Sequence, residues 1–367
     1  MTRYFNTTGP CDPAHHYYLP TADRMPDIQI YLDRQQYFVL HAPRQTGKTT
    51  AMRTLAQDLR RRGVAACWAT LEGCEGIEDF ERAEPLWLRA LHRASEDLPA
   101  AMQAPVPTTF DAGPAGNRLS DYLRAWAASI SVPLVLLLDE ADLVTGHAMV
   151  SLLRQLRDGF LDRGVGKFPT SVALIGRRAM PDYLVQAKDG RFVNPGSPFN
   201  LMAAWVTIRS YNSQEVAELL GQHTAETGQR FEPDAIAEIA RVTDGQPYLV
   251  NALADLCATQ LVPDRTQAIT RANVDAARAQ LIRARTTHLD GLVARLKDPR
   301  VARIVQAVMV GDKPFSIEYS GDDFQYVVDL GLIRLGPDGA EPANPLYREV
   351  IARQLAFNVE ETVPKPI

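Results

Sequence analysis

The stretch Gln36–Gly63, QYFVLHAPRQTGKTTAMRTLAQDLRRRG, decides how the first half of the chain folds. Its first part, Tyr37–His41, is a short run of aromatic and aliphatic residues, which predicts a β-strand. From Thr49 onward the apolar residues recur at helical spacing, and Gly63 stands where a helix commonly ends. The loop Ala42–Lys48 is therefore predicted to join a strand to the N-terminus of a helix.

A loop in this position is suited to bind phosphate, because a helix N-terminus offers unpaired backbone N–H groups and a partial positive charge. We predict that Gly47 lets the backbone curl around a phosphate, that Lys48 reaches the β- and γ-phosphates, and that Thr49 supplies a hydroxyl to Mg²⁺. The pattern G-x-x-x-x-G-K-[ST] normally begins with glycine, and here Ala42 takes that place. The predicted nucleotide-binding residues of the loop are Ala42, Pro43, Arg44, Gln45, Thr46, Gly47, Lys48, Thr49 and Thr50.

A second apolar run ends in acidic residues. Val132–Leu138, VPLVLLL, is continuous, as expected of a central parallel strand that is covered on both faces. Asp139 and Glu140 follow it, at the carboxyl end of a strand, where ligands bind in open α/β sheets. We predict that Asp139 holds Mg²⁺ through water and that Glu140 is the catalytic base that orients the attacking water. A solvated strand end is the simpler alternative.

A third apolar run, Ser171–Ile175, leads into Gly176, Arg177 and Arg178. It predicts a strand whose carboxyl end lies beside those of the two strands already named. An arginine there can contact the γ-phosphate and stabilise the charge that develops in the transition state. Arg178 is preferred to Arg177 for this role, although either arginine can instead pair with surface acids. The predicted catalytic residues are Glu140, Lys48 and Arg178.

The alternation of strands and helices in the first half predicts an α/β fold, a three-layer P-loop ATPase core with a parallel sheet. From Asn212 helical spacing takes over and predicts a helical lid, and Thr270–Leu296 reads as a long helical segment. Beyond Pro299 the order helix, helix, hairpin predicts a winged-helix domain. The predicted domains are an N-terminal segment (1–36), the ATPase core (37–211), the lid with a connecting helix (212–296), the winged helix (297–358) and a tail or linker (359–367).

Composition excludes several classes of protein. Lys and Arg number 39 against 44 Asp and Glu, a net charge of −5, so no global basic field draws the chain to nucleic acid or anionic membrane. No apolar run approaches the roughly 20 residues that span a bilayer. The N-terminus lacks the features of a secretory signal, and four cysteines are too few for a disulfide scaffold. We therefore expect a cytoplasmic protein with reduced thiols and no membrane partner.

Five arginines in Thr270–Leu296 keep DNA binding as an alternative function for this segment. Such a helix can contact DNA phosphates, although a run of this kind is more often a solvated helix face. The second helix of the predicted winged helix, Gly321–Leu330, contains three aspartates and no Lys or Arg, which favours a protein contact over reading a major groove. The arginines are Arg271, Arg278, Arg283, Arg285 and Arg295, and the aspartates are Asp322, Asp323 and Asp329.

Several stretches together resemble the bacterial AAA-like ATPases, which stand near the signal-transduction NTPases and the archaeal and origin-recognition-type ATPases. The resemblance implies an ATPase core, a lid and a winged helix, with ATP and Mg²⁺ as cofactors. It also implies that Gln246 and Pro247 lie near the adenine. The stretches are FNTTGPCDPAHHYYLP (5–20), QYFVLHAPRQTGKTT (36–50), LLLDEAD (136–142), GRRAMPDY (176–183), TDGQPYLVNAL (243–253), VVDLGLIRL (327–335) and ANPLYREVIARQL (343–355).

These observations predict a slow Mg²⁺-dependent ATPase that acts as a nucleotide switch, with ATP and ADP as ligands. Its expected partners are further copies of the chain or a protein effector. Relatives often carry a nuclease-like domain after the winged helix, and the chain stops where that domain would begin, so we expect either a truncation or a separate effector. The alternative is an ATP-dependent DNA-binding assembly protein of the origin-recognition or transposition-ATPase type. A small-molecule kinase ranks last, because no motif for an acceptor pocket is evident.

Overall fold

The computed structural model describes most of the chain, and its contacts divide the chain into two units. The sheet unit comprises Thr21–Ala42 and Lys48–Ile208, and the helical unit comprises Met1–Pro20, Pro43–Gly47 and Arg209–Ile367. The predicted N-terminal segment is thus divided between the two. The residues described are 2–25, 27–111, 113–176, 185–186, 192–193, 202–284, 287–310 and 321–362.

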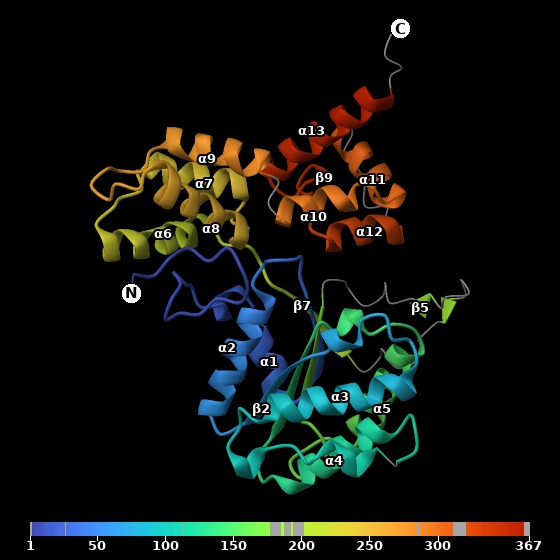
Figure 1. Ribbon diagram of the computed structural model, residues 1–367. Coiled ribbons are helices and arrows are strands. Elements are labelled where there is room, and N and C mark those ends of the chain that lie inside the picture. The colour runs from blue at the N-terminus through green and yellow to red at the C-terminus, as the bar shows by residue number, and fades with distance from the viewer. Residues whose placement is uncertain are drawn as a thin grey trace. The chain divides into compact units, whose positions relative to one another are not determined.

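A five-stranded parallel sheet forms the centre of the sheet unit, in the order β2-β3-β4-β1-β7 (Figure 1). Ala173 of β4 pairs with Phe38 on one side and with Leu137 on the other, so β4 lies between β1 and β3 as predicted. Strands β3 and β4 are buried along their whole length, which explains their continuous apolar sequences. The strands are β1 (Tyr37–His41), β2 (Ala65–Thr70), β3 (Leu134–Asp139), β4 (Ser171–Gly176) and β7 (Met202–Thr207).

Helices cover both faces of this sheet. On one face, Met52 and Ala56 pack in a common core with Leu137, and on the other Trp87 and Trp126 share a core with alternate residues of β3. The resulting three layers confirm the predicted P-loop α/β fold (Figure 1). The first face carries α1 (Ile28–Asp33) and α2 (Lys48–Arg61), and the second carries α3 (Phe80–Ser95), α4 (Arg118–Ser129) and α5 (Gly146–Phe160).

Short elements complete the sheet unit. Two strands, β5 (Val185–Gln186) and β6 (Phe192–Val193), form an antiparallel pair. The segment between α3 and α4 contains two 3-10 turns, η3 and η4. The 3-10 turns are η1 (Ala22–Arg24), η2 (Glu72–Cys74), η3 (Ala100–Met102), η4 (Pro107–Phe110) and η5 (Ala141–Leu143).

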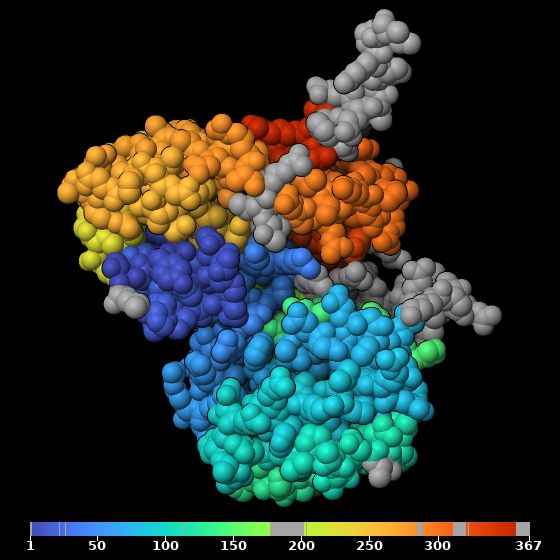
Figure 2. Space-filling view, in the orientation of Figure 1, coloured from blue at the N-terminus to red at the C-terminus, as the bar shows by residue number. Residues whose placement is uncertain are grey.

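The first helices of the helical unit correspond to the predicted lid, and the N-terminal residues pack against them. Phe5 and Tyr17 belong to the same hydrophobic core as Leu219 and Leu253, and Figure 2 shows the dark-blue N-terminal segment against these yellow and orange helices. The start of the chain is therefore part of the hydrophobic core that these helices form. The helices are α6 (Ser213–Thr227), α7 (Pro233–Thr243), α8 (Pro247–Leu256), a short π-helical turn, Cys257–Leu261, and α9 (Arg271–Arg283).

The prediction of a single long helical segment over Thr270–Leu296 is wrong. Helix α9 ends at Arg283, where the backbone N–H of Ala284 bonds to the carbonyl of Gln280, and α10 (Thr287–Arg295) begins separately. The sequence places two adjacent threonines at this junction, and threonine favours a helix start over a helix interior.

The C-terminal part of the helical unit has the predicted order of helix, helix and hairpin. It consists of α11 (Pro299–Val310), α12 (Asp322–Asp329) and an antiparallel hairpin of β8 (Ile333–Gly336) and β9 (Gly339–Pro342). Helix α13 (Pro345–Thr362) follows and extends into the segment predicted as a tail. The winged helix remains a prediction. Among the described residues, no helix is both long and apolar enough to cross a membrane.

Candidate functional site

The loop between β1 and α2 has a backbone suited to an anion. Gln45 and Gly47 both lie in the left-handed region, with φ values of 60° and 94°. Left-handed residues next to right-handed ones turn successive backbone N–H groups toward one side, which creates a concavity for anions. Thr46, between them, is buried, and its hydroxyl donates a 2.9 Å hydrogen bond to the carbonyl of Pro43. This bond closes the loop on itself.

Ala42 replaces the first glycine of the pattern without disturbing the loop. Glycine is needed where φ is positive, and Ala42 is not among the residues with positive φ. Its side chain is fully buried in the core that α2 shares with the sheet. The added methyl group therefore fills space in the interior of the sheet unit.

Lys48 is the first residue of α2 and lies against the loop. Its Nζ donates a 2.5 Å hydrogen bond to the carbonyl of Ala42, so the ammonium group is held at the loop and not extended into solvent. A lysine in this place supplies a point charge for phosphate oxygens. Of the other predicted loop residues, Arg44 is exposed and Thr50 is half-buried.

Asp139 ends the central strand β3 and is nearly buried, with 3% of its surface exposed. Its Oδ2 accepts a 2.8 Å hydrogen bond from the hydroxyl of Thr49 and a 3.3 Å bond from Nε1 of Trp68. Its Oδ1 accepts a 2.9 Å bond from the backbone N–H of Glu140. The carboxylate is therefore fixed by donors on both oxygens.

Thr49 and Asp139 together fit a magnesium ion. Hydroxyl and carboxylate oxygens are the ligands that Mg²⁺ prefers, and the ion commonly uses one or two such groups besides water and phosphate. The 2.8 Å bond brings these two oxygens together at the N-terminus of α2. The structure thus brings the two predicted metal ligands within hydrogen-bonding distance of each other.

Glu140 directly follows this carboxylate in a strained conformation. Its φ of 57° and ψ of 31° place it in the left-handed region, which non-glycine residues adopt infrequently. The fold holds it there because the buried strand β3 ends at Asp139 and the turn η5 begins at Ala141. Strain of this kind concentrates at functional sites.

Sequence reasoning missed two residues of the site, Trp68 and Arg53. Trp68 lies on β2 and bonds to Asp139, and the guanidinium of Arg53 on α2 lies 5.5 Å from the centre of its ring. One signal was available: Arg53 follows Thr49 by four residues, so both occupy the same face of α2. The partner on β2 could not be chosen without the strand register.

The remaining predicted residues divide into two groups. Arg178, together with Arg177, lies outside the described residues. Gln246 is nearly buried, caps α8 and donates a 3.4 Å hydrogen bond to the carbonyl of Gln45, within the helical unit. Pro247 is the first residue of α8, as its fixed φ favours.

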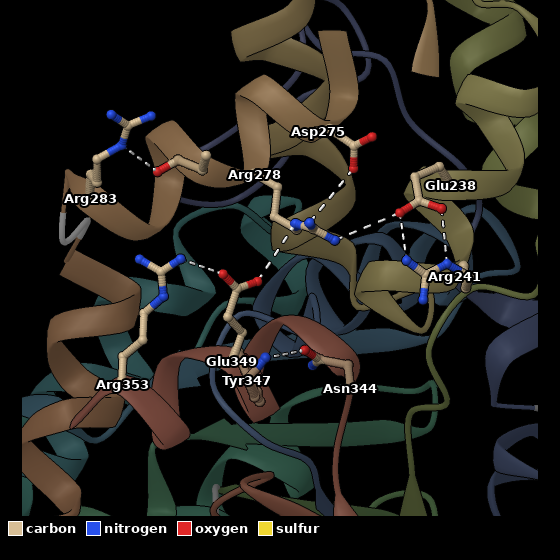
Figure 3. A network of polar contacts seen from close by, with 10 residues as sticks. Glu238, Arg241, Asp275, Arg278, Arg283, Asn344, Tyr347, Glu349 and Arg353 are labelled. Carbon is tan, nitrogen blue, oxygen red and sulfur yellow. Dashed lines mark hydrogen bonds and ion pairs between the residues drawn. The ribbon is translucent and has the colours of Figure 1, made fainter. Parts of the chain in front are cut away.

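The arginines considered for DNA binding are partly engaged within the helical unit. Arg278 of α9 contacts Glu238 of α7, Asp275 of α9 and Glu349 of α13, at 3.7, 3.7 and 3.6 Å (Figure 3). Arg271 lies 3.4 Å from the same Glu238, which is 4% exposed. These side chains tie the lid to the C-terminal helix. Arg285 lies outside the described residues.

Two acidic side chains of α12, those of Asp323 and Asp329, also have partners inside the chain. Asp323 forms a 2.8 Å ion pair with Arg303 of α11. Asp329 is 3% exposed, and its Oδ1 accepts a 2.8 Å hydrogen bond from Gln325. Helix α12 thus supplies no cationic side chain for phosphates.

The sequence is similar to those of known proteins. The chain is 25% identical over 282 residues to the Holliday junction branch migration complex subunit RuvB of Acidothermus cellulolyticus, covering 72% of this chain and 76% of that protein. The RuvB subunit of Thermobifida fusca is 29% identical over 252 residues, covering 65% and 69%.

Solved structures agree in fold. The Walker-type ATPase PABY2304 of Pyrococcus abyssi superposes with a TM-score of 0.64 at 12% identity, over 95% of this chain and 99% of that one. The ORC2 protein of Aeropyrum pernix gives a TM-score of 0.51 at 13% identity, over 94% and 97%. The model of the AAA-like domain family matches residues 32–353. The chain therefore belongs to the AAA-like domain family of P-loop ATPases.

Proposed function

We propose that this protein binds ATP with Mg²⁺, hydrolyses it slowly and uses the nucleotide state to control a protein partner. The observation that carries the proposal is the contact between the N-terminus of α2 and the end of β3, where the hydroxyl of Thr49 donates to the carboxylate of Asp139. In this junction Lys48 binds phosphate oxygens, Thr49 and Asp139 hold Mg²⁺, and the ion neutralises phosphate charge when bound.

Glu140 is the proposed general base. It follows the metal-binding carboxylate directly, and a water molecule oriented by its side chain can attack the γ-phosphate in line. Arg178 is proposed to contact the γ-phosphate, and Gln246 and Pro247 are proposed to lie near the adenine. In this scheme, loss of the γ-phosphate releases contacts that depend on it, which is the usual basis of a nucleotide switch.

The proposed partner is a protein effector or further copies of the chain. The second candidate function is that of an ATP-dependent DNA-binding assembly protein. The names of the RuvB and ORC2 relatives support the second candidate. The ion pairs of Arg271 and Arg278 and the aspartates of α12 favour the first, because these arginines already have carboxylate partners.

ATP turnover with Mg²⁺, in the presence and absence of double-stranded DNA, tests both candidates. We expect ATP turnover that does not depend on DNA. In Glu140→Gln the turnover should fall at least about 100-fold. In Lys48→Ala both ATP binding and turnover should be lost. Glu75→Gln is the matched control, because Glu75 is an exposed carboxylate of the same unit.

Unchanged turnover in Glu140→Gln would refute the role of Glu140, and unchanged ATP binding in Lys48→Ala would refute the site. Turnover that requires DNA, with an affinity that falls steeply with salt, would favour the assembly protein.

A further inference from the structure

Four residues of the sheet unit form a ring around the end of β3, which consists of three side-chain contacts and is closed by the backbone of α2. Thr49 and Arg53 extend from α2, Trp68 from β2 and Asp139 from β3. Thr49 donates to Asp139 at 2.8 Å, Trp68 donates to the same oxygen at 3.3 Å, and Arg53 lies over the Trp68 ring at 5.5 Å. Side chains of α2 thus contact two neighbouring strands, β2 through Trp68 and β3 through Asp139.

The strand register explains why Trp68 can reach Asp139. Strands β2 and β3 are parallel, with Trp68 opposite Leu137 and Thr70 opposite Asp139. Side chains alternate between the faces of a strand, so Trp68 and Asp139 both point toward the face that α2 covers. The long indole spans the two-residue offset and brings Nε1 to the carboxylate.

A buried metal-binding carboxylate needs donors that fix its plane. Groups that hydrogen-bond to metal ligands orient them, and their loss typically weakens metal binding by about 10- to 100-fold. For Asp139 the other donors are the hydroxyl of Thr49, itself a proposed metal ligand, and the backbone N–H of Glu140. Trp68 is therefore the side-chain donor that has no other proposed task in the site.

We propose that Trp68 is a positioning residue that orients Asp139 to receive Mg²⁺, and that Arg53 holds the indole ring in place for this purpose. The inference rests on the proposed function of the site. A cation over an indole ring is attracted to the electron-rich face of the ring and thereby favours one ring orientation. Arg53 is exposed, so this attraction is expected to be weak.

The first test detects the contact without nucleotide or metal. In ¹H–¹⁵N spectra of the metal-free protein, Trp68→Phe removes one indole signal and thereby assigns it. We expect Asp139→Asn to shift that signal and to leave the signal of Trp205, which lies on β7, unmoved. If the assigned signal does not move in Asp139→Asn, the proposal is overturned.

The second test measures the consequence for the metal. We expect Trp68→Phe, which keeps a ring for Arg53 but lacks the N–H donor, to weaken Mg²⁺ binding to the ADP-bound protein about tenfold. Its affinity for ADP in excess EDTA should stay within twofold of wild type. Trp205→Phe is the matched control, because Trp205 is 43% exposed and lies outside the ring of contacts.

Equal Mg²⁺ affinity in Trp68→Phe and Trp205→Phe would overturn the proposal even if the indole signal responds. A wild-type protein that binds neither ADP nor Mg²⁺ would refute the proposed function instead, and the spectra in the absence of ligand would show whether the Trp68–Asp139 contact exists. The two failures are thus distinguishable.

Discussion

The hydroxyl of Thr49 donates a 2.8 Å hydrogen bond to the carboxylate of Asp139, ninety positions further along the chain. The phosphate-loop motif and the acidic end of β3, which are remote in sequence, are therefore joined by a direct hydrogen bond. This contact brings the N-terminus of α2 to the carboxyl end of β3, and it makes the two residues interdependent.

Thr49→Val tests this interdependence, because valine keeps the branched shape but lacks the hydroxyl. We expect Mg²⁺ binding to the ADP-bound protein to weaken about tenfold or more, and Asp139 to lose one of its donors. Thr49→Ser keeps the hydroxyl and should stay within a few-fold of wild type. Titration of both variants with Mg²⁺ measures the difference, and equal losses would show that shape and not the hydroxyl matters.

Gly159 of α5 is predicted to resist substitution for reasons of space. A Cβ at this position would lie 2.2–2.3 Å from ring atoms of the fully buried Phe168. Gly159→Ala should lower the free energy of unfolding by about 1–3 kcal/mol, because the overpacked core must shift. Urea denaturation measures this change.

Gly221 of α6 provides the matched control. It also lies inside a helix, but a Cβ there would meet nothing within 4 Å. Gly221→Ala should stabilise the protein by about 0.5–1 kcal/mol, since alanine loses less backbone entropy in a helix. Changes of the same sign in both variants would contradict the packing argument.

His223 is predicted to make stability depend on pH. Burial, assisted by the charge of Arg265, lowers the pKa of His223 from its ordinary value of 6.5. The ring contacts the hydroxyl of Tyr17 at 3.2 Å, Arg265 at 3.0 Å and Gln229 at 2.9 Å, while Glu226 opposes the shift. The folded protein therefore binds this proton less readily than the unfolded chain.

The direction of the pH dependence follows from this difference in proton binding between the folded and the unfolded protein. The free energy of unfolding should be greatest above about pH 6.5 and should fall as the pH decreases below it, by at most about 1.4 kcal/mol per pH unit. His223→Gln should flatten this dependence, whereas His147→Gln, at an exposed position, should not. Denaturation curves between about pH 5 and pH 8, the range in which histidine ordinarily changes its charge, compare the three proteins.

Glu238 is predicted to hold the arginines of the lid together. It bonds to Arg241 at 2.5 and 2.9 Å and pairs with Arg271 and Arg278, and the bond from Arg241 is the largest cause of its lowered pKa. Glu238→Gln should reduce the free energy of unfolding by about 1–2 kcal/mol near neutral pH, less than a fully buried pair would cost, because the arginines are partly exposed.

The loss of unfolding free energy in Glu238→Gln should become smaller as the pH falls below the ordinary range of glutamate. Wild-type Glu238 is then protonated and uncharged, like the glutamine that replaces it. Asp275→Asn is the control, since Asp275 contacts Arg278 at 3.7 Å but is 45% exposed on its side chain. We expect a change below about 0.5 kcal/mol for it. Denaturation at two pH values distinguishes the two carboxylates, and equal effects would show that burial is unimportant here.

The sequence predicted the parts of the site that depend on local pattern. The strand at Tyr37–His41 agrees to the residue, and the end of β3 at Asp139 follows from a continuous apolar run. Both strands follow from the spacing of apolar residues, and the phosphate loop follows from its place before a helix N-terminus. The position of β4 between β1 and β3 was likewise predicted from its apolar sequence.

Features that depend on register or on distant packing were not predicted. Trp68 reads as an ordinary strand residue until the pairing of β2 with β3 places it beside Asp139. The ion pairs of Arg278 with Glu238 and Glu349 join three helices, so the sequence pattern alone could not separate them from a solvated surface. The break between α9 and α10 was missed because helical spacing continues across it.

The strand order has a consequence for synthesis of the protein. Strand β1, which leads into the phosphate loop, pairs with β4 and β7 and not with β2, the next strand in the chain. A chain that emerges from the ribosome N-terminus first must therefore keep Tyr37–His41 without a partner strand until Ser171–Gly176 has been made. Completion of the nucleotide site is thereby coupled to the synthesis of nearly half the molecule. Until then the apolar strand β1 is accessible to chaperones.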